Sequence, residues 1–101
     1  MKNFRLHPAA DAEAIAEASC IKSDDAVQGE LFVAALEKAI TQARSDPSGH
    51  QSFGGQFRKV RLGKFRFLLI YRDLEDEIQI LAVAHMSRRP GYWKQRAKNW
   101  P

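Results

Sequence analysis

The sequence predicts an α+β fold in which an antiparallel sheet of about four strands carries an N-terminal helical hairpin on one face. Apolar residues recur at helical spacing in residues 8–45, and the period changes to two from Phe57 onward. Pro47 and a Gly/Ser/His-rich loop at Ser48–Gly55 separate the two halves. Because autonomous domains usually have about 50 to 250 residues, the 101 residues are expected to form one domain, 1–101.

The first elements are a short strand and a helix. Phe4–Leu6 alternates in polarity and predicts the strand, and Pro8 then fits the first turn of a helix that reaches about Lys22. Its shallow apolar stripe consists of Ala10, Ala14, Ile15, Ala18 and Ile21. Cys20 lies in the same pattern, and we expect a buried, inert thiol. As the only cysteine, it excludes an internal disulfide.

A second helix follows, with a stronger stripe. Asp25, with Gln28 three residues later, resembles a capping box that starts the helix, and Pro47 prevents its continuation. The stripe consists of Leu31, Phe32, Ala35, Leu36, Ala39, Ile40 and Ala43. Small alanines on both stripes allow a close approach, so we expect the two helices to form an antiparallel hairpin.

The strands of the second half are Phe57–Leu62, Phe65–Arg72 and Ile78–His85. Gly63 and Lys64 suit a two-residue hairpin turn, and Leu74–Glu77 makes the next turn. The acidic residues Asp73, Glu75, Asp76 and Glu77 are expected to be solvated there. The last two strands are apolar on both faces, which places them in the middle of the sheet. Tyr92–Asn99 is predicted as a frayed helix or an extended tail.

Charge is divided unevenly between the halves. Residues 1–50 have five Lys/Arg and eight Asp/Glu, a net of −3, and residues 51–101 have eleven and four, a net of +7. The basic half indicates a phosphate-rich or acidic partner, although such charges could also serve only solubility. The apolar runs are too short to span a bilayer, and Met1–Phe4 lacks the apolar run of a signal peptide. We expect a cytoplasmic protein without a membrane partner.

Strand parity separates the basic residues of the first predicted hairpin strand. Lys59 and Arg61 share one face, and Val60 and Leu62 share the other. The two apolar residues should face the helices, which places Lys59 and Arg61 on the open face of the sheet. His85 ends the final strand, where it could act as a general acid or as a structural hydrogen-bonding group.

Four segments carry a resemblance to a known family: Val60–Leu62, Phe65–Tyr71, Ile80–His85 and Arg88–Trp93. With the order of elements, they make nearly the whole chain resemble the RelE/ParE superfamily of type II toxin–antitoxin toxins, also described as plasmid stabilisation proteins. The resemblance implies an antitoxin partner and no cofactor. RelE-like members cut messenger RNA in the ribosomal A site without a metal, whereas ParE-like members are thought to poison DNA gyrase by binding. We expect the endonuclease, with gyrase inhibition as the alternative and an inactive antitoxin-binding module as a third.

Matching the chain to RelE-like enzymes implies a basic catalytic group. Lys59 would act as base or charge stabiliser, Arg61 and Arg88 would clamp the phosphate, and His85 could supply the acid. Where those enzymes carry a middle-strand arginine this chain has Leu68, and Arg66 could substitute from about 7 Å along the strand. The remaining candidates for RNA or phosphate binding are Arg58, Arg89, Tyr92 and Trp93.

Aromatic residues of the middle strand have two readings. Phe65, Phe67 and Tyr71 are expected either in the core or in a groove for the antitoxin.

His7 and His50 show no metal-ligand spacing, so we expect no metal site.

Overall fold

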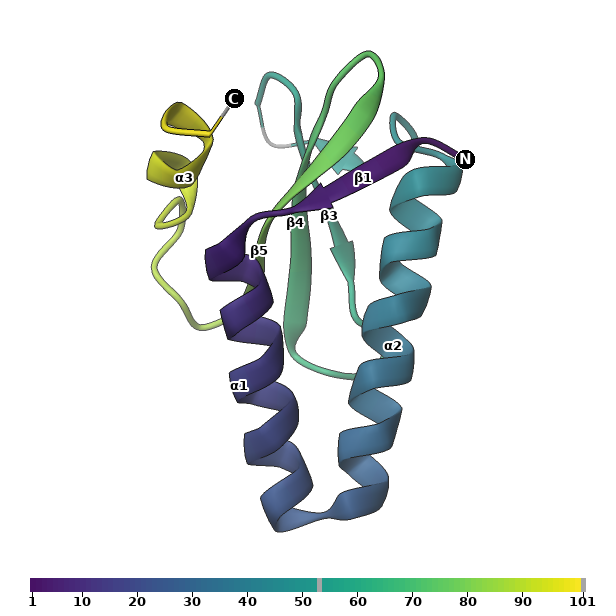
Figure 1. Cartoon of the computed structure of the whole chain (residues 1–101), viewed down its shortest axis with the longest axis vertical. Coiled ribbons are helices and arrows are strands. Elements are labelled where there is room, and N and C mark those ends of the chain that lie inside the picture. Colours follow the sequence, from purple (N-terminus) through teal and green to yellow (C-terminus); the bar gives the residue numbers. More distant parts are fainter. Residues whose placement is uncertain (53, 101) are drawn as a thin grey trace.

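A computed structural model describes residues 1–52 and 54–100 and has the predicted α+β architecture (Figure 1). Phe53, within the predicted loop Ser48–Gly55, lies outside the described residues. The elements are β1 (Asn3–Leu6), α1 (Pro8–Asp24), α2 (Ala26–Ser45), β2 (Gln51–Ser52), β3 (Phe57–Arg61), β4 (Phe67–Asp73), β5 (Glu77–His85) and α3 (Lys94–Lys98). Neither long helix of the described chain is apolar enough to cross a membrane.

The sheet has five strands in the order β1-β5-β4-β3-β2, so β4 and β5 are central as expected. Strands β3, β4 and β5 form an antiparallel meander, but β1 pairs with β5 in parallel and makes the sheet mixed. Two ion pairs hold β1 there, from Lys2 Nζ to Asp73 Oδ1 at 2.7 Å and from Arg5 Nε to Glu77 Oε2 at 2.6 Å. The acidic turn is therefore only partly a solvated cap.

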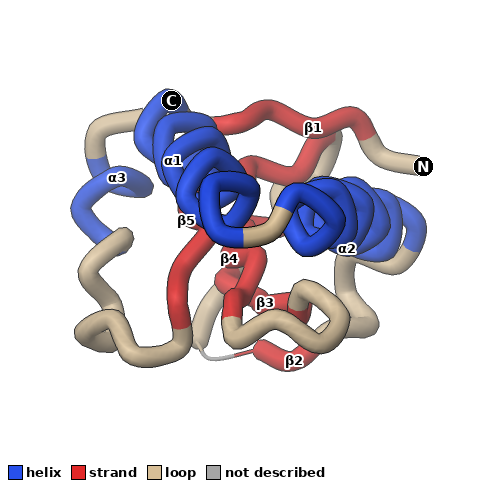
Figure 2. The backbone as a smooth tube through the Cα atoms, turned by 90° about the horizontal axis from the view of Figure 1, so that it is seen from below, coloured by secondary structure: helices blue, strands red, loops and turns tan. Residues whose placement is uncertain are grey.

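The long helices lie side by side over one face of the sheet, and α3 lies beyond α1 and β5, away from α2 (Figure 2). Asp25 links the two long helices. Its backbone N–H donates to Ile21 O, and its Oδ1 accepts from Val27 N and Gln28 N. The predicted start of α2 is confirmed. Asp25 also ends α1, because its backbone is extended.

Gly29 marks the closest approach of the two helices. A Cβ added there would lie 2.8 Å from Lys22 Cβ and 2.9 Å from Lys22 Cα. Helix propensity alone would make Gly29→Ala stabilising by about 1 kcal/mol. Because overpacking commonly costs about 1–3 kcal/mol, we expect Gly29→Ala to lower the free energy of unfolding by roughly 1 kcal/mol in urea titration. Ala34→Gly, on the exposed face of α2, controls for propensity. An unchanged or more stable Gly29→Ala variant would contradict this packing.

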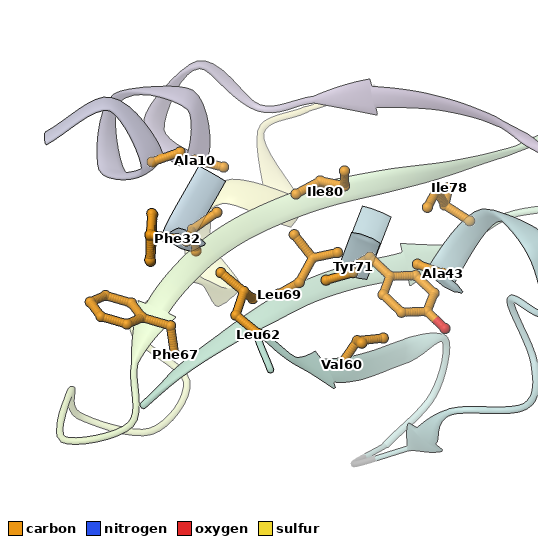
Figure 3. Packing of buried hydrophobic residues seen from close by; sticks show 13 residues of the cluster. Ala10, Phe32, Ala43, Val60, Leu62, Phe67, Leu69, Tyr71, Ile78 and Ile80 are labelled. Atoms are coloured by element: carbon orange, nitrogen blue, oxygen red, sulfur yellow. The ribbon is translucent and has the colours of Figure 1, made fainter. Parts of the chain in front are cut away.

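The main core lies between the sheet and the helical hairpin (Figure 3). Its fully buried members include Phe32, Leu62, Leu69, Tyr71, Ile78 and Ile80. Two predictions for α1 are wrong, because Ile15 is 60% exposed and Cys20 is exposed. Ile15 lies one helical step, about 100°, from buried Ala14 and leaves the core face. The hairpin extends past the end of the sheet where α1 leads into α2 (Figure 1), and Cys20 belongs to the last part of α1, which ends at Asp24.

The turn between β3 and β4 is longer than predicted. Arg61 pairs with Leu68, and the last bond across the hairpin runs from Leu62 N to Phe67 O at 3.0 Å. Residues 63–66 therefore form the loop, in which Gly63 takes a φ of 51°. Phe65 packs its side chain against the core from within this loop. Packing of that aromatic ring against the core favours the longer connection over a two-residue turn.

Candidate functional site

A pocket of about 400 Å³ lies on the face of the sheet opposite the helical hairpin. Its floor is aliphatic and consists of Leu68, Ile70 and Ala84, which belong to a second apolar cluster with Trp93 and Ala97 of the C-terminal segment. Four basic residues also line it: Lys59, Arg88, Arg89 and Lys94. An apolar floor with a cationic rim can hold a ligand that is itself apolar and anionic.

Strand β3 places Lys59 in the lining of this pocket, as the alternation of side chains along a strand requires. Val60 and Leu62 are buried under the helices, so Lys59 lies on the opposite face, paired with Ile70. Arg61 shares that face but is exposed at the strand end, where its Nε donates to Gly63 O at 3.1 Å. The pocket therefore brings Lys59 and Arg88 together, with Arg61 outside its lining.

Two predicted phosphate ligands lie elsewhere. Arg58 projects to the helical side of β3, and its Nη1 donates to His50 O at 2.8 Å, which fixes the segment after α2. Arg66 lies in the loop before β4, where its backbone carbonyl accepts from Met86 N at 2.9 Å. Neither lines the pocket. Arg58 and Arg66 thus lie outside the pocket, so Arg66 does not reach the place beside Leu68 where the resemblance implies an arginine.

His85 has a structural role. Its Nδ1 accepts from Ser87 N at 3.0 Å and lies 2.6 Å from Ser87 Oγ, and its ring packs edge-on against Phe67 at 5.0 Å. The bond from Ser87 N to Nδ1 fixes the ring at the turn that begins the pocket wall. This geometry supports the structural alternative over the general acid.

Tyr92 and Trp93 are held in place by packing and hydrogen bonding. Trp93 is only 3% exposed and packs edge-on against Phe57 at 5.0 Å, so its ring is part of the protein's own packing and offers no open face to a base. Tyr92 donates its hydroxyl to Glu13 Oε2 at 2.7 Å, and the guanidinium of Arg88 lies 3.9 Å from its ring centre. Burial, with the Glu13 hydrogen bond, raises the pKa of Tyr92 to about 12. The hydroxyl of Tyr92 is thus engaged by Glu13, and its ring is engaged by Arg88 through a cation–π contact.

Glu13, on α1, organises this region and was missed by sequence reasoning. Strand β1 ends at Leu6, which leaves the outer edge of β5 unpaired beyond Ile80. Glu13 Oε1 accepts from Val83 N at 3.1 Å and from Arg96 Nη1 at 2.8 Å, and the same Nη1 donates to Leu81 O at 2.9 Å. The Glu13–Arg96 pair thus satisfies the strand edge as a neighbouring strand would. The available signal was a glutamate beside buried Ala14.

A second arginine fixes the C-terminal segment across the open face. Arg72 donates from Nε to Gln79 Oε1 at 2.9 Å, and Gln79 is fully buried. The same guanidinium donates to Ala97 O at 3.4 Å and to Trp100 O at 3.2 Å. Together with Arg96, these bonds hold α3 beside the pocket, so the pocket wall is preorganised.

Acid should weaken the Glu13 network. Burial alone would raise the pKa of Glu13, but hydrogen bonds from Arg96, Tyr92 and Val83 outweigh it, and the pKa is lowered from 4.5. A lowered pKa in the folded state means that this stabilisation is present above about pH 4.5 and is lost as the pH falls through the folded-state value.

We therefore expect Glu13→Gln to lower the free energy of unfolding by about 1–3 kcal/mol at neutral pH. The difference from wild type should shrink in acid, measured by urea titration across pH. Glu17→Gln, on the same helix, is the matched control. A difference that does not depend on pH would contradict the assigned role of Glu13.

The predicted antitoxin contacts divide between core and surface. Phe67 and Tyr71 are 7% and 0% exposed within the main core, so for them the core alternative applies and the groove assignment is wrong. The Tyr71 hydroxyl is tied to Pro47 O at 2.5 Å. Phe65 is partly exposed and borders a second hollow with Leu31 and Lys64. It alone of the three remains a candidate contact.

The antiparallel meander and the helical hairpin on one face of the sheet form the fold expected for the RelE/ParE superfamily. Residues 4–90 match the family described as ParE toxin of type II toxin-antitoxin system, parDE. The chain belongs to this family of ParE toxins.

Individual proteins resemble the chain over different extents. Toxin ParE2 from two Mycobacterium tuberculosis strains, CDC 1551 / Oshkosh and ATCC 25618 / H37Rv, is 37% identical over 60 residues, which is 59% of this chain and 54% of each relative. The chain thus spans about half the length of these curated relatives. A solved structure described as the chromosomal ParDE TA system from P. aeruginosa matches with a TM-score of 0.62 at 20% identity, covering 84% of this chain and 96% of that one. That likeness concerns the fold.

Proposed function

We propose that the protein is the toxin of a two-component toxin–antitoxin module and that it inhibits DNA gyrase by binding, without cutting RNA. The family membership supports the toxin role and implies a cognate antitoxin. The observation that carries the binding mechanism is the lining of the pocket, an aliphatic floor of Leu68, Ile70 and Ala84 under a rim of cations. Two side chains suited to proton transfer also hold structural contacts. Tyr92 OH is bonded to Glu13, and His85 Nδ1 is bonded to the Ser87 backbone.

Metal-free RNA cleavage requires a base for the 2′-hydroxyl and an acid for the leaving 5′-oxygen. Lys59 could serve as one of these groups. The other candidates hold structural contacts, because the Tyr92 hydroxyl is bonded to Glu13 and His85 Nδ1 is bonded to Ser87 N. Leu68 supplies aliphatic floor at the position where an arginine would stabilise the phosphorane. Binding to an acidic protein surface needs only the cations and the apolar floor, both of which are present.

A second candidate is the ribosome-dependent mRNA endonuclease. One observation favours it: Lys59 and Arg88 line the same pocket, where their charges could stabilise a pentavalent phosphate. On this alternative Lys59 would act as both base and charge stabiliser, with Arg89 as an additional phosphate contact.

Induction of the chain in a bacterial host, without an antitoxin, separates the two candidates. We expect growth arrest with DNA damage signalling, filamentous cells and intact transcripts. Halted translation with messenger RNA cut at codons would refute the gyrase mechanism in favour of the endonuclease. Normal growth would leave complex formation with an antitoxin as the remaining role.

A further inference from the structure

We propose that the pocket receives an aliphatic side chain flanked by carboxylates, presented by an acidic segment of a protein partner. This inference rests on the proposed function, because it names the chemistry of the surface that the toxin would recognise. Three features of the pocket support it: the aliphatic floor, the engagement of Tyr92 and Trp93 by other side chains of the protein, and the cationic rim.

The floor fits an aliphatic side chain. Leu68, Ile70 and Ala84 present only carbon atoms on strands β4 and β5, and Pro90 adds an apolar wall. No floor residue offers a hydrogen-bond donor or acceptor from its side chain, so a nucleobase lying there would lose the hydrogen bonds of its edges to water. A leucine or isoleucine would lose none and would gain from the burial of its apolar surface.

The aromatic residues beside the floor do not provide a stacking platform. Recognition of single-stranded nucleic acid usually depends on an accessible aromatic face. Trp93 is buried against Phe57, and Tyr92 has a guanidinium stacked on its ring while its hydroxyl is bonded to Glu13. Those contacts make Tyr92 and Trp93 parts of the wall that shape the pocket.

The rim supplies charge complementarity for carboxylates. Lys59, Arg88, Arg89 and Lys94 line the pocket, and no Asp or Glu does so among the described residues. Tight turns fix the backbone at three of these residues, with Arg88 N bonded to His85 O, Tyr92 N to Arg89 O and Lys94 N to Gly91 O. Gly91 takes a φ of 77°, which favours glycine at this turn. A cationic rim on a fixed backbone around an apolar floor suits a short acidic segment with one aliphatic anchor.

The test compares three probes by NMR titration of the isotopically labelled 101-residue chain. The probes are a blocked peptide Glu-Asp-Leu-Glu-Asp, the same peptide with serine in place of leucine, and the RNA trinucleotide AAA. We expect the leucine peptide to shift amide signals of residues 84–94 and to bind about tenfold more tightly than the serine peptide. Leu68→Ser should remove most of that preference, whereas Val33→Ser on the exposed face of α2 should keep it.

Three results would overturn the proposal: tighter binding of the trinucleotide at the same residues, equal binding of the two peptides, or no shift of the pocket signals by the leucine peptide at millimolar concentration. Its failure is distinguishable from failure of the proposed function. Gyrase inhibition that is insensitive to Leu68→Ser would defeat this inference and leave the gyrase mechanism. Selective peptide binding without gyrase inhibition would do the reverse.

Discussion

Replacing Lys59 and Arg88 together by glutamine is expected to abolish toxicity. Both residues line the pocket, and they approach it from different elements, β3 and the segment after β5. Close charge pairs across protein interfaces contribute about 1.5–7 kcal/mol each in favourable cases. Even at the low end, two lost pairs equal roughly a 100-fold weaker complex with the target. The measurement is colony formation on induction, with the amount of folded protein checked in parallel.

The matched control is Lys22→Gln with Lys38→Gln. It removes the same two charges from exposed positions on the helical hairpin, away from the pocket. If net charge alone produced the effect, both double variants would lose toxicity equally. Retained toxicity of the Lys59/Arg88 variant would show that this pocket is not the site of action.

Phe32→Ala is expected to give the largest loss of stability. Phe32 is 0% exposed and meets two aromatic rings edge-on, Phe65 at 5.3 Å and Phe67 at 5.2 Å. Truncating a buried phenylalanine costs about 3–5 kcal/mol, which is a large part of the 5–15 kcal/mol typical of a domain. Phe67 in turn packs on His85, so the pocket wall should loosen as well.

Urea titration followed by circular dichroism measures the effect, with Val33→Ala as the neighbouring control. Val33 is 41% exposed on the same helix and should cost well under 1 kcal/mol. Similar losses for the two variants would contradict the assignment of Phe32 to the centre of the core.

Local pattern accounts for the features that were predicted correctly. The limits of α1 and α2 follow from Pro8, the Asp25 cap and Pro47, each of which acts within a few residues of itself. Parity alone placed Lys59 on the open face, because Val60 beside it had to be buried. Apolar residues on both faces of β4 and β5 were sufficient to place these strands at the centre.

Long-range contacts account for the features that were not predicted from the sequence. Parallel pairing of β1 depends on ion pairs between residues more than seventy positions apart, such as Lys2 and Asp73. Glu13 bonds the outer edge of β5, and this edge is open only because β1 ends before it. No local sequence pattern encodes that arrangement. The burial of Trp93 depends on α3 being held over the open face by Arg72 and Arg96. Composition correctly indicated a basic half, but only the fold separates Arg58 from the pocket.

Inhibition of purified gyrase tests the central proposal most directly. DNA supercoiling by gyrase would be followed with increasing amounts of the chain and of its Lys59→Gln/Arg88→Gln variant, in the absence of ribosomes. The proposal predicts inhibition by the wild-type chain at concentrations about 100-fold lower than by the variant. Undiminished supercoiling with the folded wild-type chain in large excess over gyrase would contradict it.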